Sequence, residues 1–217
     1  MNATASGLSP AGFWKRYVAY FIDLMLLYVL IELLGALILP DAGGPQLSQL
    51  IAMRQSMGDP QALSQQLQPM LEHTQTLLWQ SLLFSTAAYV VVGGLYFALM
   101  ESSKWQATLG KRLVGIKVTD IDGRRIGLGR ASARFLAAAL SWLTLNLGHA
   151  LAAWTPQRRA LHDYLAGTRV ENADPAHPAM PLWGWLIIAV HALIFLGSII
   201  AIFALVWLLM QAMTQAM

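Results

Sequence analysis

The sequence predicts an all-α polytopic membrane protein with three transmembrane helices, a re-entrant helical hairpin or fourth span, and a small cytoplasmic β-hairpin. Apolar residues make up 57% of the chain and charged residues only 12%, against roughly 25% charged residues in a soluble domain. Three apolar runs, 17–39, 77–100 and 182–210, each exceed the roughly 20 residues that a helix needs to cross the hydrocarbon core. An interrupted apolar stretch at 131–155 accounts for the hairpin or fourth span.

The polar segment 101–134 sets the expected orientation. It holds eight of the fourteen lysines and arginines but only three acids, and short basic loops beside apolar spans stay in the cytoplasm. Lys15 and Arg16 precede the first run, so we expect a cytoplasmic N-terminus in a multi-pass protein of the cytoplasmic (inner) membrane. The stretch 40–76 has one arginine and three acids and is expected to be an external loop.

The same signals divide the chain into parts. The first apolar run is longer than the core of roughly 7 to 15 residues in a cleaved signal peptide, so we interpret it as a retained anchor. The expected parts are a flexible N-terminus at 1–13, a membrane domain at 14–171, a Pro- and Ala-rich linker at 172–181, and a C-terminal transmembrane helix and tail at 182–217.

Two short amphipathic helices are expected in the external loop. Apolar residues recur at helical spacing within 47–51 and 63–71. Asp59 and Pro60 are typical of an N-cap and a first helical turn. The helices would lie on the outer membrane surface or continue into the second span, and their glutamine-rich faces would be solvated or contact a partner.

Two interpretations remain open for 131–155. Basic residues precede and follow it, so both of its ends carry cytoplasmic signals. Asn146 and His149 interrupt its centre, and polar groups at membrane depth occur where protein or water surrounds them. These features favour two short helices in a re-entrant hairpin. Trp142 would then lie unusually deep in the membrane, which favours one full span.

A β-hairpin is expected within the basic segment. Residues 114–120 alternate between apolar and polar, and an Asp-Gly pair at 122–123 is typical of a hairpin turn before 125–128. Residues 166–170 could add a further strand, which requires them to be cytoplasmic and so favours the re-entrant hairpin. The sequence TLGKR lacks the glycine spacing and the Ser or Thr of a phosphate loop, so nucleotide binding is rejected.

Composition excludes several function classes. The chain has no cysteine, which excludes disulfides, thiolate catalysis and cysteine-ligated metals. The net charge of +3 is explained by cytoplasmic loops, and no nucleic-acid-binding motif accompanies it. No nucleophile–base pair or set of metal ligands stands out. We therefore expect a non-enzymatic protein without cofactor, metal or nucleic-acid partner.

Asp23 is the acid whose position within the first span is hardest to accommodate in lipid. It follows Arg16 by seven residues and shares nearly the same helical face, whereas Glu32 lies on roughly the opposite face near the outer interface. An ionised carboxylate facing lipid costs several kcal/mol. Asp23 must therefore face protein, water or a cation.

Three motifs spread over 11–171 resemble one known family. They are WKRYVAYFIDLMLLY, QATLGKRLVGIKVTDIDGRRIGLGRASARFL and RRALHDYLAGTRV. Together they resemble the RDD family of membrane proteins, named for one arginine and two aspartates. The resemblance assigns these roles to Arg16, Asp23 and Asp163 and implies an integral membrane domain. For function, it implies cation/proton exchange as proposed for some members, while most members have no assigned activity.

The three family residues are expected to be arranged around one ion pair. A helical rise of about 10.5 Å separates Arg16 from Asp23, which is too far for contact to be assumed. A residue brought by another segment is the natural bridge. We therefore expect Asp163 to pair with Arg16 at the cytoplasmic boundary, with Asp23 deeper on the same side of the helix.

Two functions remain open. In the first, a polar cluster lines a partly hydrated pocket that moves a cation or proton through alternate protonation of Asp23, since interrupted helices commonly build transport sites. In the second, the same charges hold the helices together in a membrane scaffold or accessory subunit. Besides the lipid bilayer, a second copy of the chain or another membrane protein would be its partner. The candidate cluster is Arg16, Asp23, Asp163, Asn146 and His149.

Overall fold

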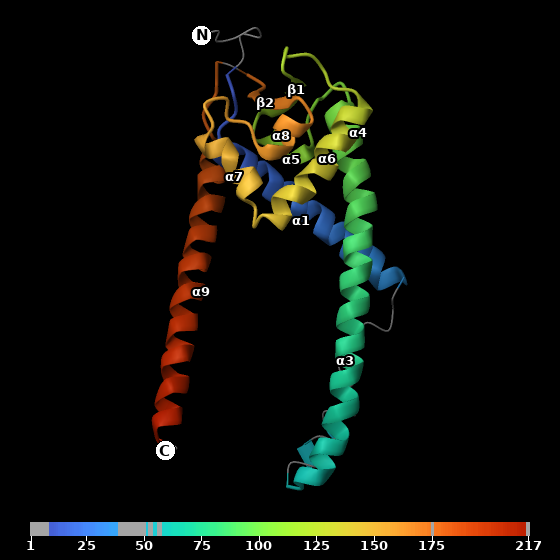
Figure 1. Cartoon of the computed structure of the whole chain (residues 1–217), viewed down its shortest axis with the longest axis vertical. Coiled ribbons are helices and arrows are strands. Elements are labelled where there is room, and N and C mark those ends of the chain that lie inside the picture. The colour runs from blue at the N-terminus through green and yellow to red at the C-terminus, as the bar shows by residue number, and fades with distance from the viewer. Residues whose placement is uncertain (1–8, 39–50, 52–53, 56–57, 175, 216–217) are drawn as a thin grey trace.

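The structure, a computed structural model, describes residues 9–38, 51, 54–55, 58–174 and 176–215. Three helical segments in this part of the chain are long and apolar enough to cross a membrane, which confirms the three predicted spans. They are α1 (Phe13–Ile38), α9 (Leu182–Gln215), and a continuous helix made of α3 (Pro60–Ala88), the π-helical turn η1 (Tyr89–Gly93) and α4 (Gly94–Ser102) (Figure 1).

The second span is longer than its apolar run because its N-terminal part is amphipathic. Asp59 caps α3 and accepts hydrogen bonds from Gln61 N and Ala62 N, and Pro60 occupies the first turn, as predicted. The predicted amphipathic helix at 63–71 is thus fused to the span. Its predicted companion at 47–51 lies almost entirely outside the described residues.

The interrupted stretch forms a bent helix pair. Helices α6 (Leu128–Leu143) and α7 (Leu147–Trp154) meet at an angle of 100°. The chain turns between them through Leu145 and Asn146, whose φ angles are 50° and 65°. The pair descends from the end of the molecule that holds the sheet and returns to the same end (Figure 1). The pair has the shape expected of a re-entrant hairpin.

A small antiparallel sheet is present, with a different second strand from the one first expected. Strand β1 (Ile116–Asp120) pairs with β2 (Thr168–Asn172) in a register that sets Val118 opposite Val170. The predicted turn exists, since Gly123 N donates to Asp120 O over 3.1 Å. Residues 125–128 nevertheless form no strand. The hairpin partner is corrected to the later segment, which was expected only to add to the sheet.

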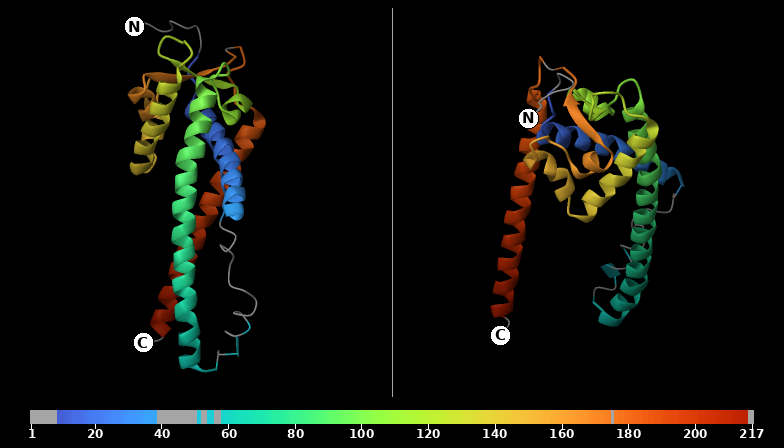
Figure 2. Two further views of the ribbon diagram at one scale, coloured as in Figure 1. Left: turned by 90° about the vertical axis from the view of Figure 1, so that its right-hand side faces the viewer. Right: turned by 45° about the horizontal axis from the view of Figure 1, so that its top comes forward.

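A compact layer surrounds this sheet. It contains the short helices α5 (Leu109–Leu113) and α8 (Leu161–Leu165). Just before α1, Ala11 N donates to Val170 O over 3.0 Å. The layer lies where α1 and α9 begin, and the C-terminus lies at the opposite end (Figure 2). Its buried apolar core consists of Ala11, Val18, Ala19, Ala98, Val114, Ile116, Val118, Ile126, Ala131 and Val170.

Candidate functional site

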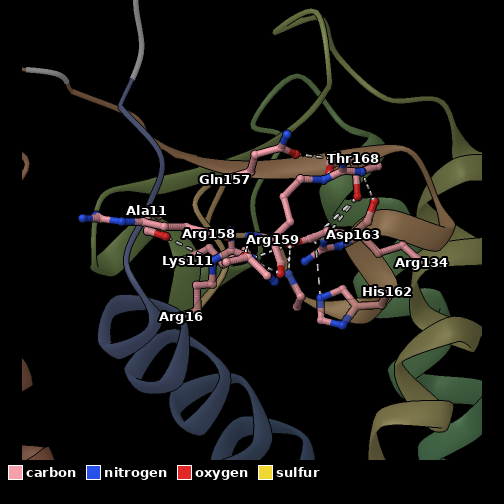
Figure 3. A network of polar contacts seen from close by, with 12 residues as sticks. Ala11, Arg16, Lys111, Arg134, Gln157, Arg158, Arg159, His162, Asp163 and Thr168 are labelled. Carbon is pink, nitrogen blue, oxygen red and sulfur yellow. Dashed lines mark hydrogen bonds and ion pairs between the residues drawn. The ribbon is translucent and has the colours of Figure 1, made fainter. Parts of the chain in front are cut away.

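A chain of buried ion pairs joins five helices, α1, α4, α5, α6 and α8. Asp163 pairs through Oδ2 with Arg16 Nη1 at 2.5 Å and through Oδ1 with Arg134 Nη1. Arg134 Nε lies 3.0 Å from Glu101 Oε2, and Lys111 Nζ lies 2.9 Å from the other oxygen of Glu101. Figure 3 shows the Asp163 end of this charge network, which we define as Arg16, Glu101, Lys111, Arg134 and Asp163.

Burial makes the charge network electrostatically strong. Its side chains range from 0% exposure at Asp163 to 12% at Arg16. Burial alone would raise the pKa of Asp163, but the adjacent guanidinium groups of Arg134 and Arg16 outweigh it and hold that pKa well below its usual range. Asp163 is therefore a fixed anion, and removing either partner would leave an uncompensated buried charge.

Local structure fixes Asp163 from the backbone side as well. It is the third residue of α8, where its Oδ2 accepts a hydrogen bond from Ala160 N over 3.0 Å. Arg159 Nη2 donates to the Asp163 carbonyl over 2.8 Å, and Thr168 from β2 lies within 3.4 Å of both Asp163 and Arg134. The sheet and α8 together hold the carboxylate in place.

The predicted pairing of Arg16 with Asp163 is confirmed. Arg16 is also held by hydrogen bonds to two backbone carbonyls. Arg16 also donates from Nε to Ala11 O over 3.3 Å and from Nη2 to Arg158 O. These contacts hold the start of α1 against the segment that follows α7. Arg16 thus connects the start of α1 to Asp163, which lies 147 residues later in the sequence.

Asp23 occupies a separate, fully buried oxygen-rich site. Its Oδ1 accepts hydrogen bonds from Tyr96 Oη over 2.7 Å and from Gly110 N over 2.8 Å, and its Oδ2 accepts one from Thr108 Oγ1 over 2.5 Å. Tyr96 Oη also accepts a hydrogen bond from Leu109 N over 3.0 Å. Within the part of the chain that the structure describes, no basic side chain forms an ion pair with Asp23.

Close backbone packing creates this site. A Cβ atom added to Gly110 would lie only 2.1 Å from Ala19 O and 3.0 Å from Asp23 Cγ. Only glycine therefore lets α5 approach α1 closely enough for its N–H to reach the carboxylate. Thr108 caps α5 with its side chain and points the same hydroxyl at Asp23.

One hydroxyl connects the Asp23 site to the charge network. Thr108 Oγ1, the donor to Asp23, also lies 3.4 Å from Lys111 Nζ. A continuous path of polar contacts consequently runs from Asp23 through Thr108, Lys111, Glu101 and Arg134 to Asp163. With Arg16 included, the path contains three acids and three bases, so its formal charges balance.

Of the other predicted site residues, His149 lies beside this path and Asn146 lies away from it. The His149 ring is 5.0 Å from the ring of His162, whose Nε2 is 3.7 Å from Asp163 Oδ1. Burial, assisted by Arg134, lowers the pKa of His162 well below its usual value, so the ring is neutral at pH 7. Asn146 is exposed in the turn between α6 and α7, where its backbone adopts a left-handed conformation.

Five of the eight side chains that build the charge network and the Asp23 site were not predicted from the sequence. Glu101, Lys111 and Arg134 were counted only as members of a polar segment that reports orientation, although Glu101 directly follows an apolar run. Such an acid beside a span is a usable signal, because burial requires it to find a basic partner. The hydroxyls of Tyr96 and Thr108 carry no comparable signal, since both residue types are common at membrane boundaries and in caps.

Sequence comparisons relate the chain to one protein family. The profile of the RDD family matches residues 10–167. The uncharacterized protein YxaI of Bacillus subtilis (strain 168) is 28% identical over 165 residues, which cover 74% of this chain and 96% of that protein. The uncharacterized protein YckC of the same organism is 33% identical over 87 residues, covering 37% of this chain and 58% of YckC.

No solved structure matches the chain significantly. The family match includes the segments that carry Arg16, Asp23 and Asp163, and it ends before α9 begins. Since the match spans well over half of the sequence, the chain belongs to the RDD family of membrane proteins.

Proposed function

We propose that this protein resides in the cytoplasmic (inner) membrane, with its N-terminus in the cytoplasm, and moves a proton or a monovalent cation through the Asp23 site. One observation carries the proposal: Asp23 is a fully buried carboxylate within the first span that is held by hydroxyl and amide donors. An ionisable residue inside a membrane span is by default a candidate for a transport pathway.

The contacts of Asp23 distinguish it from the other buried acids. Glu101 and Asp163 are each bound by two basic side chains, so protonating either one would leave buried cations unpaired. Protonation or cation binding at Asp23 breaks no ion pair. Its neighbours Tyr96 and Thr108 supply hydroxyl oxygens, which together with the carboxylate suit a hard cation.

The charge network has a defined part in this proposal. Lys111 contacts Thr108, and Thr108 contacts Asp23, so a change of charge at Asp23 is transmitted to Lys111 and Glu101. Arg16 and Asp163 keep the cytoplasmic end of α1 fixed while this happens. The proposal involves no covalent chemistry and no cofactor.

A membrane scaffold or accessory subunit is the second candidate. It is favoured by the charge network, in which every charged side chain forms an ion pair with another, because buried and paired charges hold helices in one arrangement. In that function a second copy of the chain or another membrane protein would be the partner. The two candidates differ in one measurable property, since a scaffold moves no ions.

Proton flux in liposomes tests the proposal. The purified full chain is reconstituted with a pH-sensitive dye inside, and gradients of sodium, potassium and lithium are applied in turn. Asp23→Asn should abolish flux, because the amide keeps nearly the same size but carries no exchangeable acidic proton. Glu32→Gln is the matched control, since it removes the exposed acid of the same helix and should leave flux unchanged.

Thr108→Val probes the link to the charge network without changing any charge. It removes the hydroxyl that joins Asp23 to Lys111 and should reduce flux while the protein still inserts. Normal flux in Asp23→Asn would contradict transport through Asp23. Absence of flux in the wild type under all three gradients would favour the scaffold.

A further inference from the structure

A pocket outside the charge network lies where two spans begin. Its volume is about 560 Å³, within the roughly 300 to 1,000 Å³ typical of small-ligand sites. It is built from the segment before α1, the first residues of α1, the loop after α7, the end of β2 and the start of α9. Its lining includes Phe13, Trp14, Lys15, Arg158, Asn172, Met180 and Trp185.

The charge in this pocket is positive and has no acidic partner. Lys15 is only 6% exposed and donates from Nζ to Asn172 Oδ1 over 2.9 Å. Arg158 is exposed and donates from Nη1 to Pro10 O over 3.3 Å. None of the lining residues is an acid, and among the described residues neither Lys15 nor Arg158 forms an ion pair with one. An anion would therefore meet two uncompensated cations.

The rest of the lining is suited to an amphiphile. Phe13 and Met180 present apolar surface, and Trp14 and Trp185 are about half exposed, at 48% and 50%. Tryptophan collects where a membrane span meets the headgroup region. Phe13 is the first residue of α1, and Trp185 lies in the first turn of α9, so the pocket lies at the level where both spans begin.

We propose that this pocket binds the headgroup of an anionic phospholipid. The phosphate lies between Lys15 and Arg158, and the acyl chains run along the exposed apolar surface of α9, beginning at Leu182 and Leu186. Basic pockets between transmembrane helices on the cytoplasmic side are a recognised setting for such headgroups. The proposal is independent of ion movement at Asp23, because no residue that contacts Asp23 lines this pocket.

Lipid binding to the purified full chain in detergent provides the test. The probes are dioleoylphosphatidylglycerol, zwitterionic dioleoylphosphatidylcholine and soluble glycerol 3-phosphate, with bound lipid counted by native mass spectrometry and affinity obtained by titration. Phosphatidylglycerol should bind most tightly, and its affinity should fall as salt is raised. Glycerol 3-phosphate should bind much more weakly because it lacks the acyl chains.

Two substitutions and one control locate the site. Lys15→Gln keeps a donor for Asn172, and Arg158→Asn suits the left-handed backbone, whose φ is 50°. Each should weaken phosphatidylglycerol binding about fivefold, and together about 25-fold. Arg125→Gln removes one exposed positive charge from the same end of the molecule and should have no such effect.

The outcomes separate this proposal from its alternatives. Equal binding of phosphatidylglycerol and phosphatidylcholine overturns it, as does unchanged binding in Arg158→Asn. Equally tight binding of glycerol 3-phosphate would replace the lipid by a soluble anion. Arg158 is exposed and its carbonyl contact to Arg16 does not involve the side chain, so this variant remains informative even if Lys15→Gln lowers the melting temperature.

Discussion

At the scale of single residues, Asp163 is the centre of the charge network at the end of the molecule that holds the sheet. It forms ion pairs with both Arg16 and Arg134. Swapping the residue types at positions 16 and 163 therefore does not simply reverse one isolated ion pair. An arginine at position 163 would face Arg134 in a buried setting. The double reversal Arg16→Asp with Asp163→Arg is therefore expected to leave the protein as unstable as the single variants.

Asp163→Asn should lower the free energy of unfolding by about 3 to 5 kcal/mol, because two buried guanidinium groups lose their counter-ion. The matched control is Asp122→Asn. Asp122 contacts Arg124 at 3.9 Å with both side chains more than half exposed, and such surface pairs contribute less than about 1 kcal/mol. Unfolding in detergent measures both, and equal losses would contradict the stabilising role of Asp163.

His162 should make stability depend on pH. Burial and the neighbouring Arg134 lower its pKa in the folded protein, while the unfolded value is about 6.5. Between these two values the unfolded chain binds more protons, so stability is full above about pH 6.5 and decreases as the pH falls, by up to about 1.4 kcal/mol per pH unit.

Replacing this histidine isolates its contribution. The unfolding free energy of His162→Gln should change less between pH 7 and pH 5 than that of the wild type. His177→Gln, which replaces an exposed histidine, should retain the wild-type pH dependence. An identical pH dependence in His162→Gln and the wild type would show that His162 is not the group that binds the proton.

At the scale of elements, the contact between α1 and α5 depends on Gly110. Gly110→Ala should separate the two helices, because the new methyl group would overlap Ala19 O. The Asp23 carboxylate would then lose its backbone donor. We expect a strong loss of folded protein, measured as monodisperse yield after size-exclusion chromatography.

Gly129→Ala is the matched control for this substitution. Gly129 lies in α6 and has nothing within 4 Å of an added Cβ atom. Alanine there should stabilise the helix by up to about 1 kcal/mol. Equal yields of Gly110→Ala and the wild type would contradict the close packing of α5 on α1.

At the scale of the whole molecule, the bent pair of α6 and α7 decides the topology, and we expect it to be a re-entrant hairpin. The loop after β1 and the linker before α9 lie at one end, and the C-terminus of α9 lies at the other (Figure 2). Because the chain has no cysteine, single-cysteine variants report topology directly. An impermeant maleimide should label Asp122→Cys and Asp174→Cys only in inverted vesicles, and Thr214→Cys only in intact cells. Labelling of Asp174→Cys from outside would indicate a fourth span.

The sequence by itself determined the three spans, the N-cap of the second span and the family. Bilayer thickness sets a minimum length of apolar sequence, so the spans can be found from composition alone. The pattern around Asp59 and Pro60 similarly predicts the start of α3, because a helix N-terminus is built from neighbouring residues. The pairing of Arg16 with Asp163 could also be predicted, since a charge beside a span needs a partner at the same depth.

Only the tertiary structure decided which segments meet. Strand β1 pairs with β2 instead of the segment after its own turn, because the bent pair of α6 and α7 returns α8 and β2 to the same layer. Asp23 and Thr108 are 85 residues apart and make contact only because Gly110 admits α5 to the surface of α1. Such contacts depend on packing between distant segments, and neither hydrophobic periodicity nor charge counts contain that information.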